Sequence, residues 1–169
     1  MTPERKEHLK LAVCAVAIWL LCLALMFWVM SVHAQAAKYR RAANGDSLND
    51  LTLTPGATLP DETAKTLCAK TFHTGTVRHV TGATKQKACA EYGVPKARCN
   101  GKNYEIDHLI SLELGGSDAL TNLWPQPYPS ARAKDLVEDA LHRRVCAGKI
   151  SLGAAQACIS SDWTSCPTD

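Results

Sequence analysis

The pattern of hydrophobic and polar positions divides the chain into three parts. Residues 11–32 are almost entirely apolar and follow a short basic stretch, a pattern typical of a secretion signal or a membrane anchor. Residues 37–65 show little sustained periodicity and contain several Gly and Pro turn signals, which predict a linker. From residue 66 onward apolar positions recur with helical and strand periods, so residues 66–169 are predicted to form the folded domain.

Two interpretations of the N-terminal segment, residues 1–36, stay open. Ala34-Gln35-Ala36 offers a small-x-small cleavage site after the apolar run, as in a signal peptide. The run is longer than the usual signal core and reaches the roughly 20 residues that span a bilayer, as in a transmembrane anchor. The expected location is therefore periplasmic or secreted, or anchored in the inner membrane by residues 11–32, in which case the membrane is a partner.

The periodicities in the folded domain predict a small α+β arrangement. Apolar residues alternate with polar ones around Asp107, and Gly115-Gly116 ends that strand. Ser130 is expected to cap the long helix that follows, and Gly148 lies just beyond its end. The predicted elements are a helix over 84–92, a strand over 104–114, a short strand over 122–126, and helices over 131–146 and 151–161.

The cysteines predict disulfides in an oxidising compartment. An even number of them lies in the short folded domain, which is typical of an exported, disulfide-stapled fold. The spacing contains no C-x-x-C pair, which disfavours a zinc knuckle or a thioredoxin-like site, and it leaves the pairing open. The candidates are Cys68, Cys89, Cys99, Cys146, Cys158 and Cys166.

The net charge argues against one class of nucleic-acid-binding protein. At +3 the chain is only mildly basic, whereas a protein that coats DNA along its length is usually more basic. An enzyme that holds one phosphodiester briefly needs no such charge. If the chain acts on nucleic acid, non-specific or structure-preferring recognition is therefore expected rather than a long recognition surface.

Asp107-His108, at the end of the predicted strand, is the best candidate for chemistry. Hydrolysis of a phosphodiester needs a base that takes a proton from water, a divalent ion on the phosphate, and a group that orients the base. Histidine suits the first task because its reference pKa is about 6.5. Asp107 suits the second, because a hard ion such as Mg²⁺ prefers carboxylate oxygens and often has only one or two protein ligands.

The motifs around this pair resemble those of the HNH (His-Me finger, ββα-metal) nucleases, in particular a branch of small bacterial and phage proteins. The resemblance rests on D-H-L-I at residues 107–110, L-E-L-G-G at 112–116 and N-L-W-P at 122–125, and is clearest from residue 104 to about 148. It implies a ββα-metal core of two short strands and a helix, here with extra flanking helices and behind an N-terminal hydrophobic helix.

The resemblance also assigns roles to residues. It makes His108 the general base, Asp107 a metal ligand and Asn122 a residue that orients the loop and the base. The chain departs from the family where many members have a histidine near the start of the helix. Asp135 and Glu138 are the carboxylates available there, so the one divalent ion is expected to be Mg²⁺ or Mn²⁺ rather than Zn²⁺.

Two basic residues are candidates for contact with nucleic acid. Arg78 lies in a basic stretch and suits bidentate phosphate binding. Lys134 is a second candidate, although it also pairs with Glu138 at i, i+4, a spacing that simply supports a helix.

The sequence therefore favours a metal-dependent endonuclease that hydrolyses phosphodiester bonds, with DNA the first expectation and RNA the second. A catalytically inactive HNH-like binding module, exported or membrane-tethered, is the alternative, because the helix lacks the usual histidine. In a third interpretation, a tethered structural protein, the Asp-His pair is incidental.

Overall fold

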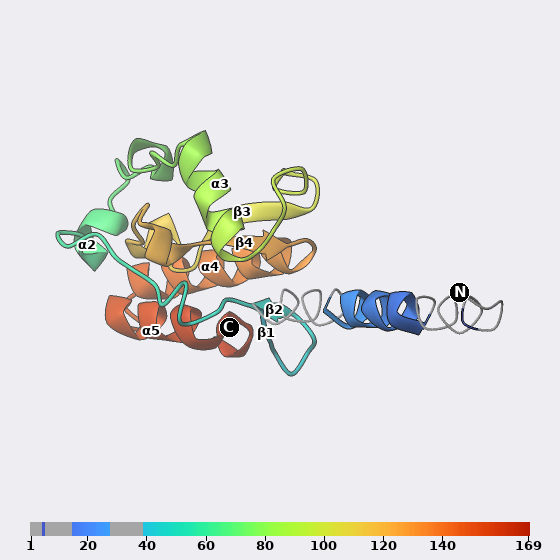
Figure 1. Cartoon of the computed structure of the whole chain (residues 1–169). Helices are drawn as coiled ribbons and strands as arrows, with labels where there is room; N and C mark the ends of the chain where they lie inside the picture. Colours follow the sequence, from blue (N-terminus) through green and yellow to red (C-terminus); the bar gives the residue numbers. More distant parts are fainter. Residues whose placement is uncertain (1–4, 6–14, 28–38) are drawn as a thin grey trace. The chain divides into compact units, whose positions relative to one another are not determined.

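The computed structural model describes residues 5, 15–27 and 39–169, in two compact units that divide after residue 37 (Figure 1). In the first unit, residues 15–27 are helical. None of the helices among the described residues is both long and apolar enough to cross a membrane. The predicted cleavage site at residues 34–36 and both ends of the apolar run 11–32 lie outside the described residues.

The second unit is mixed α+β, as predicted, with two small antiparallel sheets among its described residues. Short 3₁₀ turns lie at Thr74–Thr76, Leu112–Leu114, Leu120–Asn122 and Trp163–Ser165. The main elements are β1 (Arg40–Arg41), β2 (Ser47–Leu48), α2 (Ala64–Leu67), α3 (Gly82–Glu91), β3 (Tyr104–His108), β4 (Leu123–Pro127), α4 (Ser130–Cys146) and α5 (Leu152–Asp162).

The predicted helices and strands are present, and most of their ends lie within one or two residues of the predicted positions. Two differences have a clear physical cause. The strand expected to run to Leu114 stops at His108, because the chain turns into a 3₁₀ helix that ends at Gly115 with a φ of 76°. Ser130 is not the cap of α4 but its first residue, and its hydroxyl donates a hydrogen bond to the Asp46 carboxylate over 2.7 Å.

Residues 39–65, in the stretch predicted to be a linker, pack against the rest of the second unit. Leu48 is 3% exposed, and Gly56 N–H donates to the Thr121 carbonyl. The Asn49 side chain is buried and donates to the Thr54 carbonyl over 2.6 Å. The segment is held largely by buried polar groups, which produce no hydrophobic period, and this is why its packing was not predicted.

Strands β3 and β4 form a hairpin that lies between α3 and α4 (Figure 1). Ile106 and Tyr104 pack against the cluster that contains Cys89 of α3. A second apolar cluster joins α4, α5 and the C-terminal turn, with Leu141, Ile159 and Trp163 at its centre. The hairpin is thus held on both sides, and its end at His108 is fixed in position.

Three disulfides staple this unit: Cys68–Cys146, Cys89–Cys99 and Cys158–Cys166. They use all six cysteines that the sequence pattern predicts to pair. The first spans 78 residues and ties α2 to α4, whereas the other two span 10 and 8 residues.

The long-range disulfide is expected to stabilise the fold most. The chain-entropy relation gives about 4.5 kcal/mol for a loop of this length and about 2.5 kcal/mol for the shortest loop. We therefore expect Cys68→Ala/Cys146→Ala to lower the free energy of unfolding more than Cys158→Ala/Cys166→Ala does, as measured by urea denaturation. An equal or reversed order would contradict the entropic explanation.

Candidate functional site

The loop between β3 and β4 is closed by Asn122. Its side-chain oxygen accepts the N–H of Ile110 over 2.9 Å, and its amide nitrogen donates to the carbonyls of Ile110 and Ser117 over 3.0 and 2.9 Å. Gly116 permits this closure, because a Cβ there would lie 1.8 Å from the Ile110 carbonyl oxygen. Asn122 is fully buried. These side-chain hydrogen bonds hold the backbone of the loop.

The loop presents Asp118 to His108. His108 Nε2 lies 2.7 Å from Asp118 Oδ1, and Asp118 Oδ2 accepts the backbone N–H of His79. Both oxygens of this carboxylate are therefore held. Burial lowers the pKa of His108, although the neighbouring Asp118 and Asp107 act in the opposite direction. Partial burial would raise the pKa of Asp118, but its hydrogen bonds with His108 and His79 outweigh this and lower that pKa.

This pair selects one tautomer of His108. An ionised carboxylate only accepts hydrogen bonds, so the proton of the neutral ring resides on Nε2, beside Asp118. Nδ1 then carries the free lone pair and is the nitrogen able to take a proton from water. Sequence reasoning missed Asp118. The one available signal was an acidic residue just after the paired glycines.

Asp107 points away from His108, as alternation along a strand requires, and meets a buried lysine from α4. Lys134 Nζ lies 2.7 Å from Asp107 Oδ2 and 2.8 Å from the carbonyl oxygen of His108, and it also bonds Glu138 Oε1. Lys134 is fully buried. Burial alone would lower the pKa of Lys134, but the two carboxylates outweigh it and raise that pKa.

The contacts of Lys134 are therefore not those of the phosphate-binding residue that the sequence suggested. An ammonium has three N–H groups, and here two carboxylates and one carbonyl accept them. The i, i+4 pairing with Glu138, which was the alternative, is present. Arg78 is exposed and stays within electrostatic reach of His108.

Acidic groups outnumber basic ones around Asp107. Burial and the neighbouring Asp107 charge raise the pKa of Glu105 and of Asp135. The pKa of Glu138 is also raised by burial and by Asp107, because one ammonium cannot neutralise two carboxylates. Only Asp107 and Glu138 contact the buried ammonium of Lys134 directly. Carboxylate oxygens are the ligands that Mg²⁺ and Mn²⁺ prefer, so Asp107, Glu138 and Asp135 are the side chains at this place with the right chemistry for such an ion.

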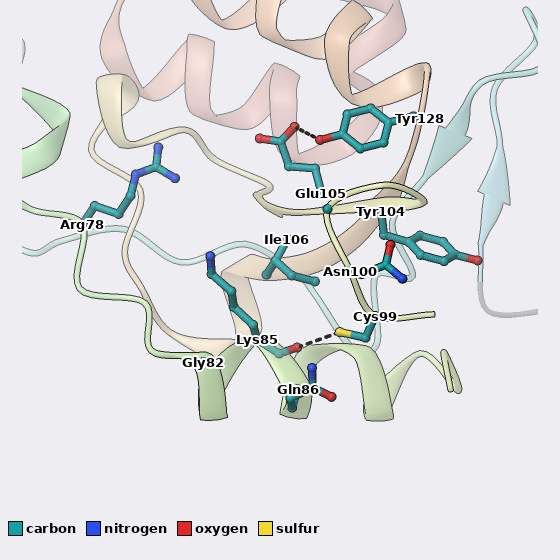
Figure 2. Close-up of a pocket in the computed structure, with 11 residues that line it drawn as sticks. Arg78, Gly82, Lys85, Gln86, Cys99, Asn100, Tyr104, Glu105, Ile106 and Tyr128 are labelled. Carbon is teal, nitrogen blue, oxygen red and sulfur yellow. Dashed lines mark hydrogen bonds between the residues drawn. The ribbon is translucent and has the colours of Figure 1, made fainter. Parts of the chain in front are cut away.

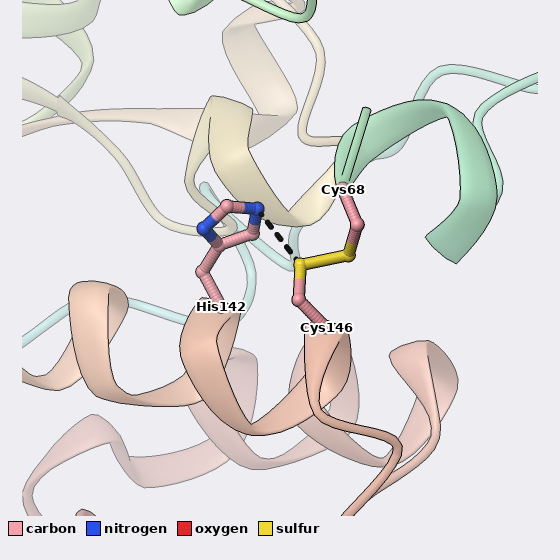
Figure 3. A group of neighbouring side chains, drawn as sticks. All are labelled: Cys68, His142 and Cys146. Carbon is pink, nitrogen blue, oxygen red and sulfur yellow. Dashed lines mark hydrogen bonds between the residues drawn. A yellow bond between two sulfur atoms is a disulfide. The ribbon is translucent and has the colours of Figure 1, made fainter. Parts of the chain in front are cut away.

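A separate Cys-His group lies between α2 and α4 (Figure 3). The potential ligand atoms of Cys68, His142 and Cys146 all lie within 4.8 Å of one another. Among the described residues, Asp107, Asp135 and Glu138 do not form such a group. His142 Nε2 lies 3.4 Å from Cys146 Sγ and 3.2 Å from the Leu67 carbonyl. Because Cys68 and Cys146 form a disulfide, they offer thiolate ligands to a metal only after reduction.

Comparisons with protein families, curated proteins and solved structures found no match to this chain.

Proposed function

We propose that the protein is a metal-dependent endonuclease of the HNH type, with a ββα-metal core formed by β3, β4 and α4. It hydrolyses phosphodiester bonds of nucleic acid, DNA in preference to RNA. The observation that carries the proposal is the His108–Asp118 pair, whose side chains lie 2.7 Å apart. His108 is the last residue of β3, and Asp107 directly precedes it in that strand. Water-dependent cleavage of a phosphodiester requires a base and a group that holds a cation, and the neighbouring residues His108 and Asp107 have the chemistry for these two tasks.

His108 Nδ1 takes the proton from the attacking water, while Asp118 stabilises the positive charge that the ring then acquires. Asn122 holds the loop that carries Asp118, so its effect on the reaction is indirect. Asp107 would hold the divalent ion, with Glu138 and Asp135 as the nearest further carboxylates. Such an ion, when bound, supplies positive charge to the phosphate and the leaving oxygen.

The three disulfides and the apolar N-terminal segment support action in an oxidising compartment, outside the cytoplasm. The substrate is then nucleic acid in the periplasm or outside the cell.

The experiment is a supercoiled-plasmid nicking assay with Mg²⁺ or Mn²⁺, in which wild type is compared with Asp118→Asn. The Asn amide donates to Nε2 and drives the ring proton onto Nδ1, which blocks the base with little change in shape. We expect nicking by wild type and at least a 100-fold slower rate in Asp118→Asn. The ¹⁵N shifts of the His108 ring should show the exchanged tautomer. A variant with the exchanged tautomer and an unchanged rate would exclude His108 Nδ1 as the base.

One observation favours a second candidate, a catalytically inactive nucleic-acid-binding module. The ammonium of Lys134 lies between Asp107 and Glu138, where two metal ligands would otherwise converge. If wild type binds nucleic acid but cuts no plasmid with any divalent ion, this candidate replaces the nuclease.

A further inference from the structure

Two neighbouring hollows lie beside the hairpin and share Gly101 and Tyr128 as lining residues. Their volumes are about 340 and 580 Å³. The first hollow lies between α3 and β3, and Figure 2 shows Lys85 and Gln86 on one wall and Glu105 and Tyr128 opposite. We call the two together the basic groove, because four cationic residues line them: Arg78, Lys85, Lys102 and Arg132.

The basic groove begins next to the candidate centre. Arg78 interacts electrostatically with both His108 and Glu105, and it precedes His79, whose N–H is bonded to Asp118. Ile106 lines the groove and directly precedes Asp107 in β3. A chain of phosphates passing His108 would therefore enter the groove at its Arg78 end.

The charge in the groove suits a polyanion. Its four cations face one carboxylate, Glu105, which accepts the hydroxyl of Tyr128 over 3.1 Å. The cations lie along the groove instead of clustering at one point, since Arg78 and Lys85 line the first hollow and Lys102 and Arg132 the second. Such spacing matches repeated phosphates better than a single small anion.

The remaining lining suits unpaired bases. Tyr104 lines the first hollow and Tyr128 lines both, and Arg132 lies over the Tyr128 ring at 5.7 Å from its centre. Aromatic faces stack on bases of any sequence, and the neighbouring amide of Gln86 has the groups to hydrogen-bond a base edge. In a duplex the base faces are already stacked on one another, so these tyrosines favour a strand whose bases are free.

We propose that the basic groove binds a single-stranded segment of nucleic acid adjacent to the bond that is cut. This deepens the proposed nuclease function and rests on it. The preferred substrate is then a strand that is unpaired on one side of the cleavage site, such as a single strand, a flap or a frayed end.

The test measures binding and cleavage separately in the full chain, kept in solution with a non-ionic detergent because of its apolar N-terminal segment. Binding is followed by the fluorescence anisotropy of a labelled oligothymidylate and of a hairpin duplex of equal length. The His108→Gln background is used so that no turnover occurs. Lys85→Gln/Arg132→Gln removes two groove cations. Lys65→Gln/Lys149→Gln, which removes two exposed lysines outside the groove, is the matched control.

We expect tighter binding of the single strand than of the duplex, and about tenfold weaker binding in the double variant with no change in the control. The slope of log affinity against log salt should fall by about 0.7 for each phosphate that the variant no longer neutralises. Equal affinity for both probes, no measurable binding, or equal weakening in variant and control would overturn the groove proposal.

Wild-type cleavage is scored separately. If plasmid is nicked but the groove variant binds and cuts like wild type, the groove proposal fails and the nuclease stands. If the groove binds single strands but nothing is cut, the hydrolytic function fails.

Discussion

Replacing His108 with alanine is expected to lower the rate of metal-dependent plasmid cleavage by about 100- to 10,000-fold, the usual contribution of a general base. The ring has a lone pair of suitable basicity on Nδ1, because its other nitrogen is bonded to Asp118. Burial lowers the pKa of His108, which keeps the ring neutral and able to accept a proton at neutral pH. Single-turnover rates measured with excess enzyme will test this prediction.

Loss of the fold must be separated from loss of the base, because His108 is 3% exposed and alanine leaves a cavity. Lys134 bonds the His108 carbonyl rather than the ring, so that hydrogen bond survives the substitution. His108→Gln keeps most of the volume and a donor for Asp118 but has no basic nitrogen, and we expect the same loss of rate. His73→Ala, at an exposed histidine, is the control and should cut like wild type. If His108→Gln retains full activity in a folded protein, His108 is not the base.

Much of the fold could be predicted because it follows from local patterns. The period of β3 and α4 and the glycines at 115, 116 and 148 are local features of the chain, and the structure places a strand, a tight loop and a helix there. The segment from residue 39 to 65 could not be predicted in this way. Its stability comes from hydrogen bonds to residues far along the chain, such as that of Ala57 N–H with Asn122, which leave no periodic signal.

The site shows the same division. The motif names His108, Asp107 and Asn122, and the hairpin register places them at one end of β3 and β4. Asp118 and Lys134 acquire their roles only from the fold. Asp118 reaches His108 because the loop folds back over Gly116, and Lys134 reaches Asp107 because α4 packs on the hairpin. Sequence spacing indicated one partner for Lys134, Glu138, but could not indicate that its ammonium is buried among three acceptors.

Lys134→Met is expected to lower the free energy of unfolding by about 3–5 kcal/mol, the usual cost of removing one partner from a buried ion pair. The substitution keeps the apolar length of the side chain but leaves Asp107 and Glu138 facing each other without a counter-ion. It also leaves the His108 carbonyl without the hydrogen bond from Nζ. Urea denaturation at neutral pH in the presence of a chelator gives the free energy. A loss below about 1 kcal/mol, the scale of an exposed pair, would mean that the ammonium is not the counter-ion of a buried cluster.

A second substitution tests the cause. In Lys134→Met/Glu138→Leu the uncompensated carboxylate of Glu138 is removed together with the ammonium, so much of the stability should return. Glu138→Leu alone should cost less than Lys134→Met alone, because Asp107 still neutralises the lysine. Additive effects in the double variant would show that the two side chains do not interact in the folded protein.

The same variant separates the two kinds of cation that this cluster can hold. Without its ammonium, the acidic cluster carries a larger surplus of negative charge, so Mn²⁺ or Mg²⁺ should raise the melting temperature of Lys134→Met more than that of wild type, in a saturable way. Isothermal titration should then show tighter Mn²⁺ binding to the variant, which would mean that the lysine and the divalent ion compete for the Asp107 carboxylate. If neither protein responds to any divalent ion, Lys134 is the resident cation of the cluster, and the metal-dependent part of the proposed mechanism is wrong. That outcome leaves the pairing of His108 with Asp118 unaffected.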